Sequence, residues 1–100
     1  MKNKIKITEN DVKRQVKDYL SIKGYFHFHI LQGMGAYKGI PDIIAIKNGR
    51  TLFCEVKRPG GKQSDHQILF QSNIWEKGGH YILVKCLDDL IEAINKIEKP

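Results

Sequence analysis

The sequence has only two cysteines, no long apolar run and no repeat or low-complexity segment. No stretch approaches the ~20 consecutive apolar residues that a membrane-spanning helix needs. The start of the chain is basic but lacks the apolar core of a signal peptide, so we expect a cytoplasmic location, in a bacterium or a virus-infected host cell. Cys54 and Cys86 show no CxxC spacing, which argues against a cysteine-bound zinc ion. We expect both cysteines to be reduced and buried.

The chain carries 17 Lys and Arg residues against 11 Asp and Glu residues, which gives a net charge of +6. Such an excess of positive charge favours an anionic partner, and nucleic acid is the leading candidate. A length of 100 residues suffices for one hydrophobic core but not for two. We therefore expect a single domain over residues 1–100.

Apolar periodicity and turn signals predict three helices and four strands. Thr8, with Asp11 three residues later, has the pattern of a helix N-cap, and Ser64 precedes a second helix in which Trp75 is expected to join the core. The expected fold class is α/β, with a small mixed β-sheet flanked by helices. The predicted elements are a helix from Thr8 to Gly24, strands Tyr25–Leu31, Ile40–Lys47 and Arg50–Lys57, a helix from Ser64 to Lys77, a strand His80–Lys85 and a helix Leu87–Ile97, with a glycine-rich loop at 32–39.

The Asn48-Gly49 dipeptide between two strands predicts a two-residue hairpin and its register. In such a hairpin the paired residue numbers sum to 97, so Asp42 lies directly opposite Glu55. Residues paired in this way have Cβ atoms about 4.5–5.5 Å apart on one face of the sheet. Lys57 shares that face because it lies two residues after Glu55 on the same strand. The sequence therefore predicts two carboxylates and an ammonium group on one surface.

Two carboxylates held opposite each other repel, and a divalent cation resolves the conflict. Oxygen ligands suit Mg²⁺ or Mn²⁺, which can polarise a phosphodiester and lower the pKa of a bound water. Lys57 could orient that water or offset the charge that develops on the phosphorane. The alternative is a set of ordinary surface charges, with a Glu55–Lys57 pair worth under about 1 kcal/mol. Their position within otherwise apolar strands favours a functional role.

Pro41-Asp42 followed by Glu55-Val56-Lys57, after a strand, a turn and a strand, resembles the signature of the PD-(D/E)xK nucleases. The wider context is similar to the virus-type replication-repair nuclease family, the VRR-NUC domains, over roughly residues 8 to 95. The stretches that carry this wider similarity are Thr8–Asp11, Lys38–Asp42 and Glu55–Ser64, together with Gln67 and Gly78-Gly79.

The resemblance implies an αβββαβ restriction-endonuclease-like core, here followed by a C-terminal helix, and cleavage of DNA that depends on a divalent metal. Small stand-alone members of the family resemble Holliday-junction resolvases and can act as homodimers. The site residues that the resemblance implies are Asp42, Glu55 and the backbone carbonyl of Val56 as metal ligands, and Lys57, Glu9 and Gln67 as further catalytic groups.

Two of these residues also have simpler interpretations. Glu9 lies at helical spacing with Val12 and Val16, which fits a carboxylate aimed at the site, but an acidic residue in a first helical turn also complements the helix dipole. Gln67 stands three residues after Ser64, in the position where it could cap the second helix. The two roles of Gln67 are not exclusive.

Basic and aromatic residues flank the proposed site in the sequence. As a set, Lys38, Arg58 and Lys62 could bind phosphates with little dependence on nucleotide sequence, although each alone is a common surface charge. Tyr37 could stack on a base or cover the core. His27-Phe28-His29 has the spacing of a zinc-binding pair, but no third ligand stands at a suitable spacing, so packed or surface histidines are favoured.

The leading interpretation is an endodeoxyribonuclease that depends on Mg²⁺ or Mn²⁺. We expect it to act in DNA repair or replication on branched DNA, such as Holliday junctions or flaps, and to form a homodimer. The alternatives are a catalytically silent nucleic-acid-binding module and a structural subunit of a replication or repair complex.

Overall fold

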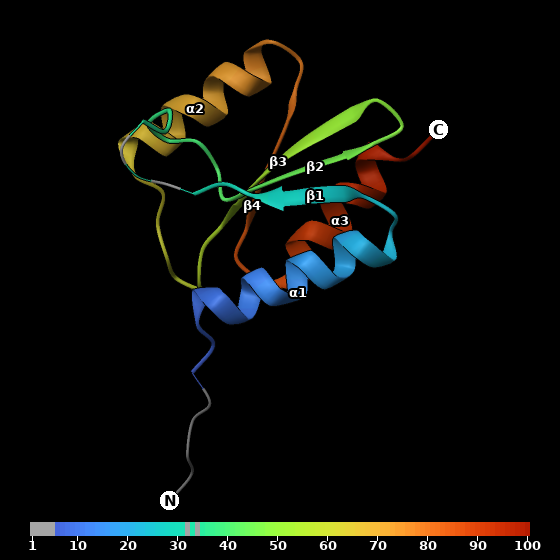
Figure 1. The fold of residues 1–100 in the computed structure, drawn as a ribbon, viewed down its shortest axis with the longest axis horizontal. Coiled ribbons are helices and arrows are strands. Elements are labelled where there is room, and N and C mark those ends of the chain that lie inside the picture. The colour runs from blue at the N-terminus through green and yellow to red at the C-terminus, as the bar shows by residue number, and fades with distance from the viewer. Residues whose placement is uncertain (1–5, 32, 34) are drawn as a thin grey trace, which may run out of the picture.

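The computed structural model describes residues 6–31, 33 and 35–100 of the chain. The predicted α/β class and the predicted order of elements are confirmed (Figure 1). Gln32 and Met34, both in the predicted glycine-rich loop, lie outside the described residues. The elements are α1 (Glu9–Ile22), β1 (Phe26–His29), β2 (Ile43–Lys47), β3 (Arg50–Val56), α2 (Asp65–Glu76), β4 (His80–Val84) and α3 (Leu87–Ile97).

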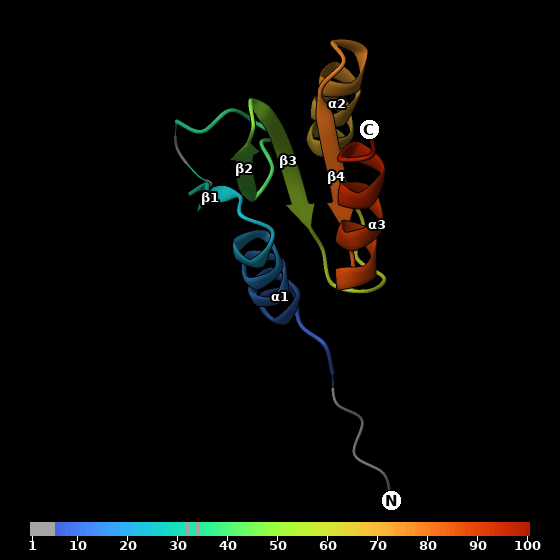
Figure 2. The ribbon, with the colours of Figure 1, turned by 90° about the vertical axis from the view of Figure 1, so that its right-hand side faces the viewer.

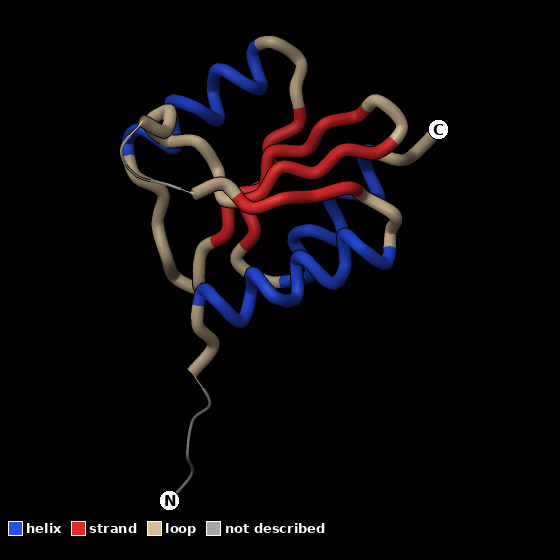
Figure 3. Tube along the Cα trace, in the orientation of Figure 1, coloured by secondary structure: helices blue, strands red, loops and turns tan. Residues whose placement is uncertain are grey.

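The four strands form one mixed sheet in the order β1-β2-β3-β4. β1, β2 and β3 run antiparallel to their neighbours, whereas β4 pairs parallel with β3. A parallel pair needs a long crossover connection, and α2 supplies it between β3 and β4 (Figure 3).

Helices cover both faces of the sheet. α1 and α3 lie together on one face and α2 lies on the other (Figures 1 and 2). Because side chains alternate along a strand, every second residue of β3 faces α1 and α3. Among the residues that the structure describes, no helix is long and apolar enough to cross a membrane. The buried core on the α1–α3 side comprises Val12, Val16, Leu20, Tyr25, Ile43, Ala45, Leu52, Cys54, Val56, Ile82, Val84, Leu90 and Ile94.

The strands are shorter than predicted, most clearly at the start of β2, which begins at Ile43 and not at Ile40. Pro41 has no N–H to donate to the sheet. Asp42 accepts the Val56 N–H with its side chain, and its backbone carbonyl accepts the Ile30 N–H. At Asp42 a hydrogen bond from the Val56 backbone to the Asp42 side chain therefore replaces the backbone pairing of the hairpin. The other strands each end one or two residues inside the predicted bounds, at Phe26–His29, at Val56 and at Val84.

Two residues that we expected to be buried are exposed. Cys86 is solvent-exposed because it directly precedes α3 as its N-cap, outside β4, whereas Cys54 is buried as predicted. The Trp75 side chain is 57% exposed, and its Nε1 donates to the Tyr81 carbonyl at 3.4 Å. Phe70, on another side of α2, packs against the sheet instead, with its ring centroid 6.3 Å from that of Tyr81. A residue five positions further along a helix points in a different direction, which accounts for the exposure of Trp75.

Candidate active site

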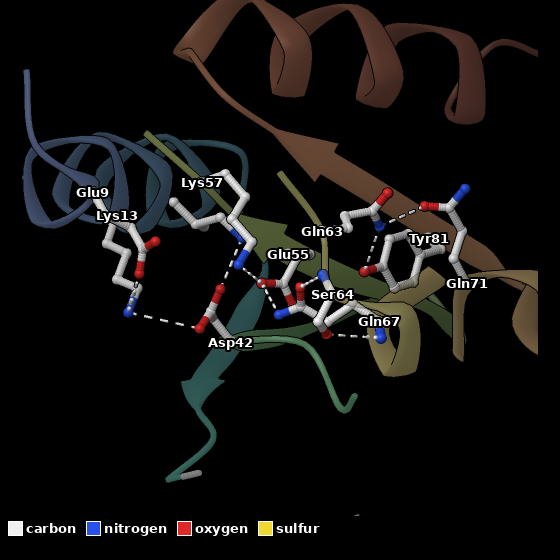
Figure 4. A network of polar contacts seen from close by, with 11 residues as sticks. Glu9, Lys13, Asp42, Glu55, Lys57, Gln63, Ser64, Gln67, Gln71 and Tyr81 are labelled. Carbon is white, nitrogen blue, oxygen red and sulfur yellow. Dashed lines mark hydrogen bonds and ion pairs between the residues drawn. The ribbon is translucent and has the colours of Figure 1, made fainter. Parts of the chain in front are cut away.

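The turn at Asn48-Gly49 sets the register of the β2–β3 hairpin as predicted. Both residues have positive φ, 53° and 75°, as a tight two-residue hairpin turn requires. The observed pairs keep the predicted sum of 97, ending with Ile43 opposite Cys54. Asp42 is the next residue away from the turn, and it lies beside Glu55 at the open end of the hairpin (Figure 4).

Asp42 is buried and its two carboxylate oxygens have different partners. The side chain is 8% exposed. Oδ2 accepts the backbone N–H of Val56 at 2.8 Å, and Oδ1 lies 3.6 Å from the Lys13 ammonium. The hydrogen bond from the backbone of β3 fixes the direction of the carboxylate, so that Oδ1 turns toward charged groups.

Glu55 is the most deeply buried charged side chain of the site, with a relative exposure of 1%. Its Oε2 accepts a hydrogen bond from Gln67 Nε2 at 2.8 Å and lies 3.8 Å from Lys57 Nζ. Its Oε1 is buried and accepts no hydrogen bond from any described residue. A buried carboxylate oxygen without a partner is costly, so this atom points to a ligand.

The surroundings of Glu55 disfavour its charge. Burial raises the pKa of the Glu55 carboxyl to about 8, and the nearby Asp42 carboxylate adds to the rise, while the Lys57 ammonium opposes it. The raised pKa favours the protonated form of Glu55 in the metal-free protein. A perturbed carboxyl of this kind beside a second carboxylate is typical of a functional site.

Gln67 caps α2 and also contacts Glu55. Its side-chain oxygen accepts the Ser64 N–H at 2.8 Å, and Ser64 Oγ accepts the Gln67 N–H at 3.2 Å, which forms the predicted capping box. The same side chain donates through Nε2 to Glu55. Because the cap holds one end of the amide, the other end is fixed toward the carboxylate.

The loop before β2 packs closely against this first turn of α2. Gly39 has a φ of +83°, and a Cβ atom at this position would lie 2.2 Å from the His66 carbonyl oxygen. Only glycine permits both the backbone conformation and the close approach. The contact places the loop that leads into Asp42 beside the backbone of Gln67, and so joins the two halves of the site.

Lys13 is a residue of the site that the sequence interpretation missed. Its Nζ lies 3.3 Å from Glu9 Oε2 and 3.6 Å from Asp42 Oδ1, so Glu9 is linked to Asp42 through Lys13 (Figure 4). The Glu9 side chain itself is 41% exposed. Lys13 follows Glu9 by four residues, the spacing at which oppositely charged side chains pair on a helix. The sequence therefore did contain a signal for the Glu9–Lys13 pair.

The basic and aromatic residues that were predicted to contact DNA are exposed, and two of them lie against α2. Lys38, Arg58 and Lys62 are all solvent-exposed. The Tyr37 ring is 68% exposed and lies edge-on to Phe70, with centroids 5.9 Å apart. Tyr37 and Lys38 thus line a hollow of about 240 Å³ against α2, next to the helix turn that carries Gln67.

The carboxylates fit a divalent cation that keeps most of its ligands as water. No group of three or more His, Cys, Asp or Glu side chains placed to hold a metal occurs within residues 6–31, 33 and 35–100. Mg²⁺ commonly takes only one or two carboxylates and completes its shell with water and substrate phosphate. Asp42 and Glu55 supply two, and Glu55 has a buried oxygen that accepts no hydrogen bond within the described part of the chain. His27, one of the two histidines that have the spacing of a zinc-binding pair, forms a hydrogen bond with Ser21 at 2.8 Å.

Comparison with known proteins shows a similarity between this chain and a phage protein. No known family model matches the chain. The chain is 30% identical over 61 residues to a protein named "Putative nuclease p44" from Acyrthosiphon pisum secondary endosymbiont phage 1. The alignment covers 58% of this chain and 66% of the phage protein, slightly less than two thirds of its length.

Proposed function

We propose that the protein is a nuclease that hydrolyses phosphodiester bonds with the help of Mg²⁺ or Mn²⁺. The observation that carries the proposal is the buried Asp42–Glu55 pair beside the Lys57 ammonium, with one Glu55 oxygen that lacks a hydrogen-bond partner among the described residues. The similarity to a phage protein named as a nuclease supports it independently. The net charge of +6 suits a polyanionic substrate.

In the proposed mechanism Asp42, Glu55 and the Val56 carbonyl would hold the cation. A cation held there would supply Lewis-acid chemistry, by polarising the phosphodiester and lowering the pKa of a water molecule. Gln67 keeps the Glu55 carboxylate aimed at the cation through its 2.8 Å hydrogen bond. Because the Lys57 side chain is only 20% exposed, its ammonium is poorly screened and can stabilise negative charge that develops on the phosphate.

The finer substrate assignment follows from the resemblance of the sequence to VRR-NUC domains. We propose cleavage within DNA strands at branch points, such as Holliday junctions or flaps, during repair or replication in the cytoplasm. Exposed Lys38, Arg58, Lys62 and Tyr37 would contact the DNA outside the cleavage centre. Their exposure leaves these side chains accessible to a large ligand.

Metal-dependent cleavage is the first prediction. Purified protein incubated with plasmid and with four-way-junction DNA should cut only when Mg²⁺ or Mn²⁺ is present, and gel electrophoresis would separate nicked from doubly cut products. Lys57→Ala should lower the rate by about 100-fold or more, typical of the loss of one electrostatic stabiliser in an active site. Lys47→Ala, a half-buried lysine at the turn end of the β2–β3 hairpin, is the matched control and should cut at the wild-type rate.

The outcomes of this assay separate the candidate functions. DNA binding without cleavage under every metal condition would favour a catalytically silent binding module. Neither binding nor cleavage would favour a structural subunit of a larger complex. Cleavage by Lys57→Ala at the wild-type rate would remove Lys57 from the mechanism while leaving the nuclease assignment in place.

A homodimer is the second prediction, since two active sites are a natural way to cut two strands. On β1 and β2 the side chains of Phe26, Phe28 and Ile46 are 68%, 41% and 38% exposed, and they lie on the sheet face that carries α2. Exposed apolar side chains grouped on one face are typical of an interaction surface. Sedimentation equilibrium should give twice the chain mass of 11.5 kDa, and a value of one chain mass would contradict the prediction.

A further inference from the structure

A second group of basic side chains lies beside the carboxylates, on the opposite side from α2. A hollow of about 380 Å³ opens between α1 and the end of β1. Lys13 and Lys17 lie one helical turn apart on α1, so their side chains follow the same side of the helix. The hollow is lined by Asn10, Lys13, Arg14, Lys17, Asp18 and His29.

The hollow lies next to the proposed cleavage centre. Lys13 lines it and also lies 3.6 Å from Asp42 Oδ1. His29 lies opposite Ile43, the residue that follows Asp42, in the β1–β2 ladder. Burial lowers the pKa of His29, and the charges of Lys13 and Lys17 lower it further, whereas Asp42 acts in the reverse direction. The pKa of His29 therefore depends both on the charges of the hollow and on the Asp42 carboxylate.

The chemistry of the lining suits an anion. Lys13, Arg14 and Lys17 contribute three positive charges, against the single acidic side chain of Asp18. Part of this charge is offset from outside the hollow, since Arg14 lies 3.6 Å from Asp11, and Lys13 lies 3.3 Å from Glu9 and 3.6 Å from Asp42. Arg14 and Lys17 are exposed and remain accessible to a ligand. An open basic surface of this kind attracts the phosphate groups of a nucleic-acid backbone without reading its bases.

We propose that the α1–β1 hollow binds a phosphate of the nucleic-acid strand that flanks the phosphodiester to be cut. This inference rests on the proposed nuclease function and adds to it the path that the nucleic-acid strand takes across the protein. The strand enters along Lys17 and Arg14, passes Asp42 and Glu55, and leaves toward Lys38 and the hollow against α2. Lys13 connects the two parts, because its side chain lines the hollow and its ammonium lies 3.6 Å from Asp42 Oδ1.

Binding measured in the absence of cleavage tests the hollow by itself. Fluorescence anisotropy with a labelled DNA oligonucleotide in EDTA should show weaker affinity for Lys17→Gln and for Arg14→Gln than for the wild type. With a duplex oligonucleotide, each variant should also reduce the steepness of the plot of log K against log salt concentration by up to about 0.9, the amount expected when one whole phosphate contact is lost. Lys96→Gln removes the same charge from exposed α3 and should retain the wild-type slope.

A neutral backbone linkage tests which phosphate is bound. Oligonucleotides that carry one methylphosphonate, moved stepwise along the strand, should bind the wild type more weakly at one or two positions next to the cut. At those positions Lys17→Gln should be insensitive to the substitution, because the contact is already absent. Equal sensitivity of wild type and Lys17→Gln at every position would overturn the assignment of the hollow.

The two proposals fail in different ways. Wild-type protein that binds DNA through Lys17 but never cuts it would refute the nuclease function and leave the hollow as a phosphate site. Wild-type protein that cuts DNA, with Lys17→Gln and Arg14→Gln matching Lys96→Gln in affinity and salt slope, would refute the hollow alone. Thermal unfolding of each variant establishes that the exposed substitutions leave the fold intact.

Discussion

Replacing Asp42 by asparagine should lower the rate of DNA cleavage by about 10³-fold, since a bound cation provides several kcal/mol of charge stabilisation and each 1.4 kcal/mol corresponds to about tenfold in rate. An asparagine oxygen can still accept the Val56 N–H that now bonds to Asp42 Oδ2 at 2.8 Å. The oxygen that faces Lys13 would become an amide nitrogen, which cannot ligate a cation. The variant should thus keep the hairpin and lose the charge.

The measurement is a single-turnover cleavage rate at saturating Mn²⁺, with thermal unfolding recorded for the same preparation. Asp88→Asn, an exposed acidic residue in the first turn of α3, removes the same charge at a distance from the site and should cut at the wild-type rate. A folded Asp42→Asn protein that retains wild-type activity would contradict the assignment of Asp42 as a cation ligand.

Glu55→Gln should reduce cleavage by a similar factor of about 10³, because it removes the other carboxylate ligand. The same substitution should stabilise the metal-free protein at alkaline pH. Glutamine matches glutamate in size, and its side-chain oxygen can accept the hydrogen bond from Gln67 Nε2. The variant therefore removes a buried charge without opening a cavity, so activity and stability should change in opposite directions.

The sign of the stability effect follows from the pKa of Glu55. That pKa rises from 4.5 in an unperturbed carboxyl to about 8 in the folded protein. Between these values the folded protein binds the proton and the unfolded chain does not, so stability falls as the pH rises through about 8. Each pKa unit corresponds to about 1.4 kcal/mol, so the loss is at most about 5 kcal/mol. We expect Glu55→Gln to recover about 1–3 kcal/mol of it at pH 9.

Urea unfolding in EDTA at pH 5 and at pH 9 would measure the stability difference between Glu55→Gln and wild type. The advantage of the variant should be small at pH 5 and larger at pH 9. Glu76→Gln, at the exposed end of α2, makes the same substitution outside the site and should show no such pH dependence. A variant that is less stable than wild type at pH 9 would contradict the interpretation that burial disfavours the Glu55 charge.

Local sequence signals were sufficient wherever the controlling interaction is short in sequence. The Asn48-Gly49 turn and the alternation of β3 predicted the hairpin register residue by residue, because a two-residue turn leaves little freedom in the pairing. The capping boxes at Thr8 and Ser64 follow from spacings of three residues. The same register predicts that Asp42 and Glu55 lie together on one side of the sheet.

Local signals failed where burial depends on how elements pack. Trp75 is apolar and lies on a helix, yet it is exposed because α2 turns Gln67 and Phe70 toward the sheet. Cys86 lies between β4 and α3, and its exposure depends on where the strand ends. Helical spacing alone does not determine which side of α2 meets the sheet when its apolar residues point in several directions.

The sequence alone determined the order of elements, the hairpin register and the juxtaposition of Asp42 with Glu55, because each depends on contacts within about 20 residues and on backbone preferences. The tertiary structure alone decided that Lys13 lies against Asp42 and that Gln67 contacts both the cap of α2 and Glu55. It also decided that Glu55 Oε1 is buried without a hydrogen-bond partner from the residues that the structure describes. These features arise where α1, the sheet and α2 converge. Their distances depend on the packing of helices against both faces of the sheet, which no local pattern in the chain encodes.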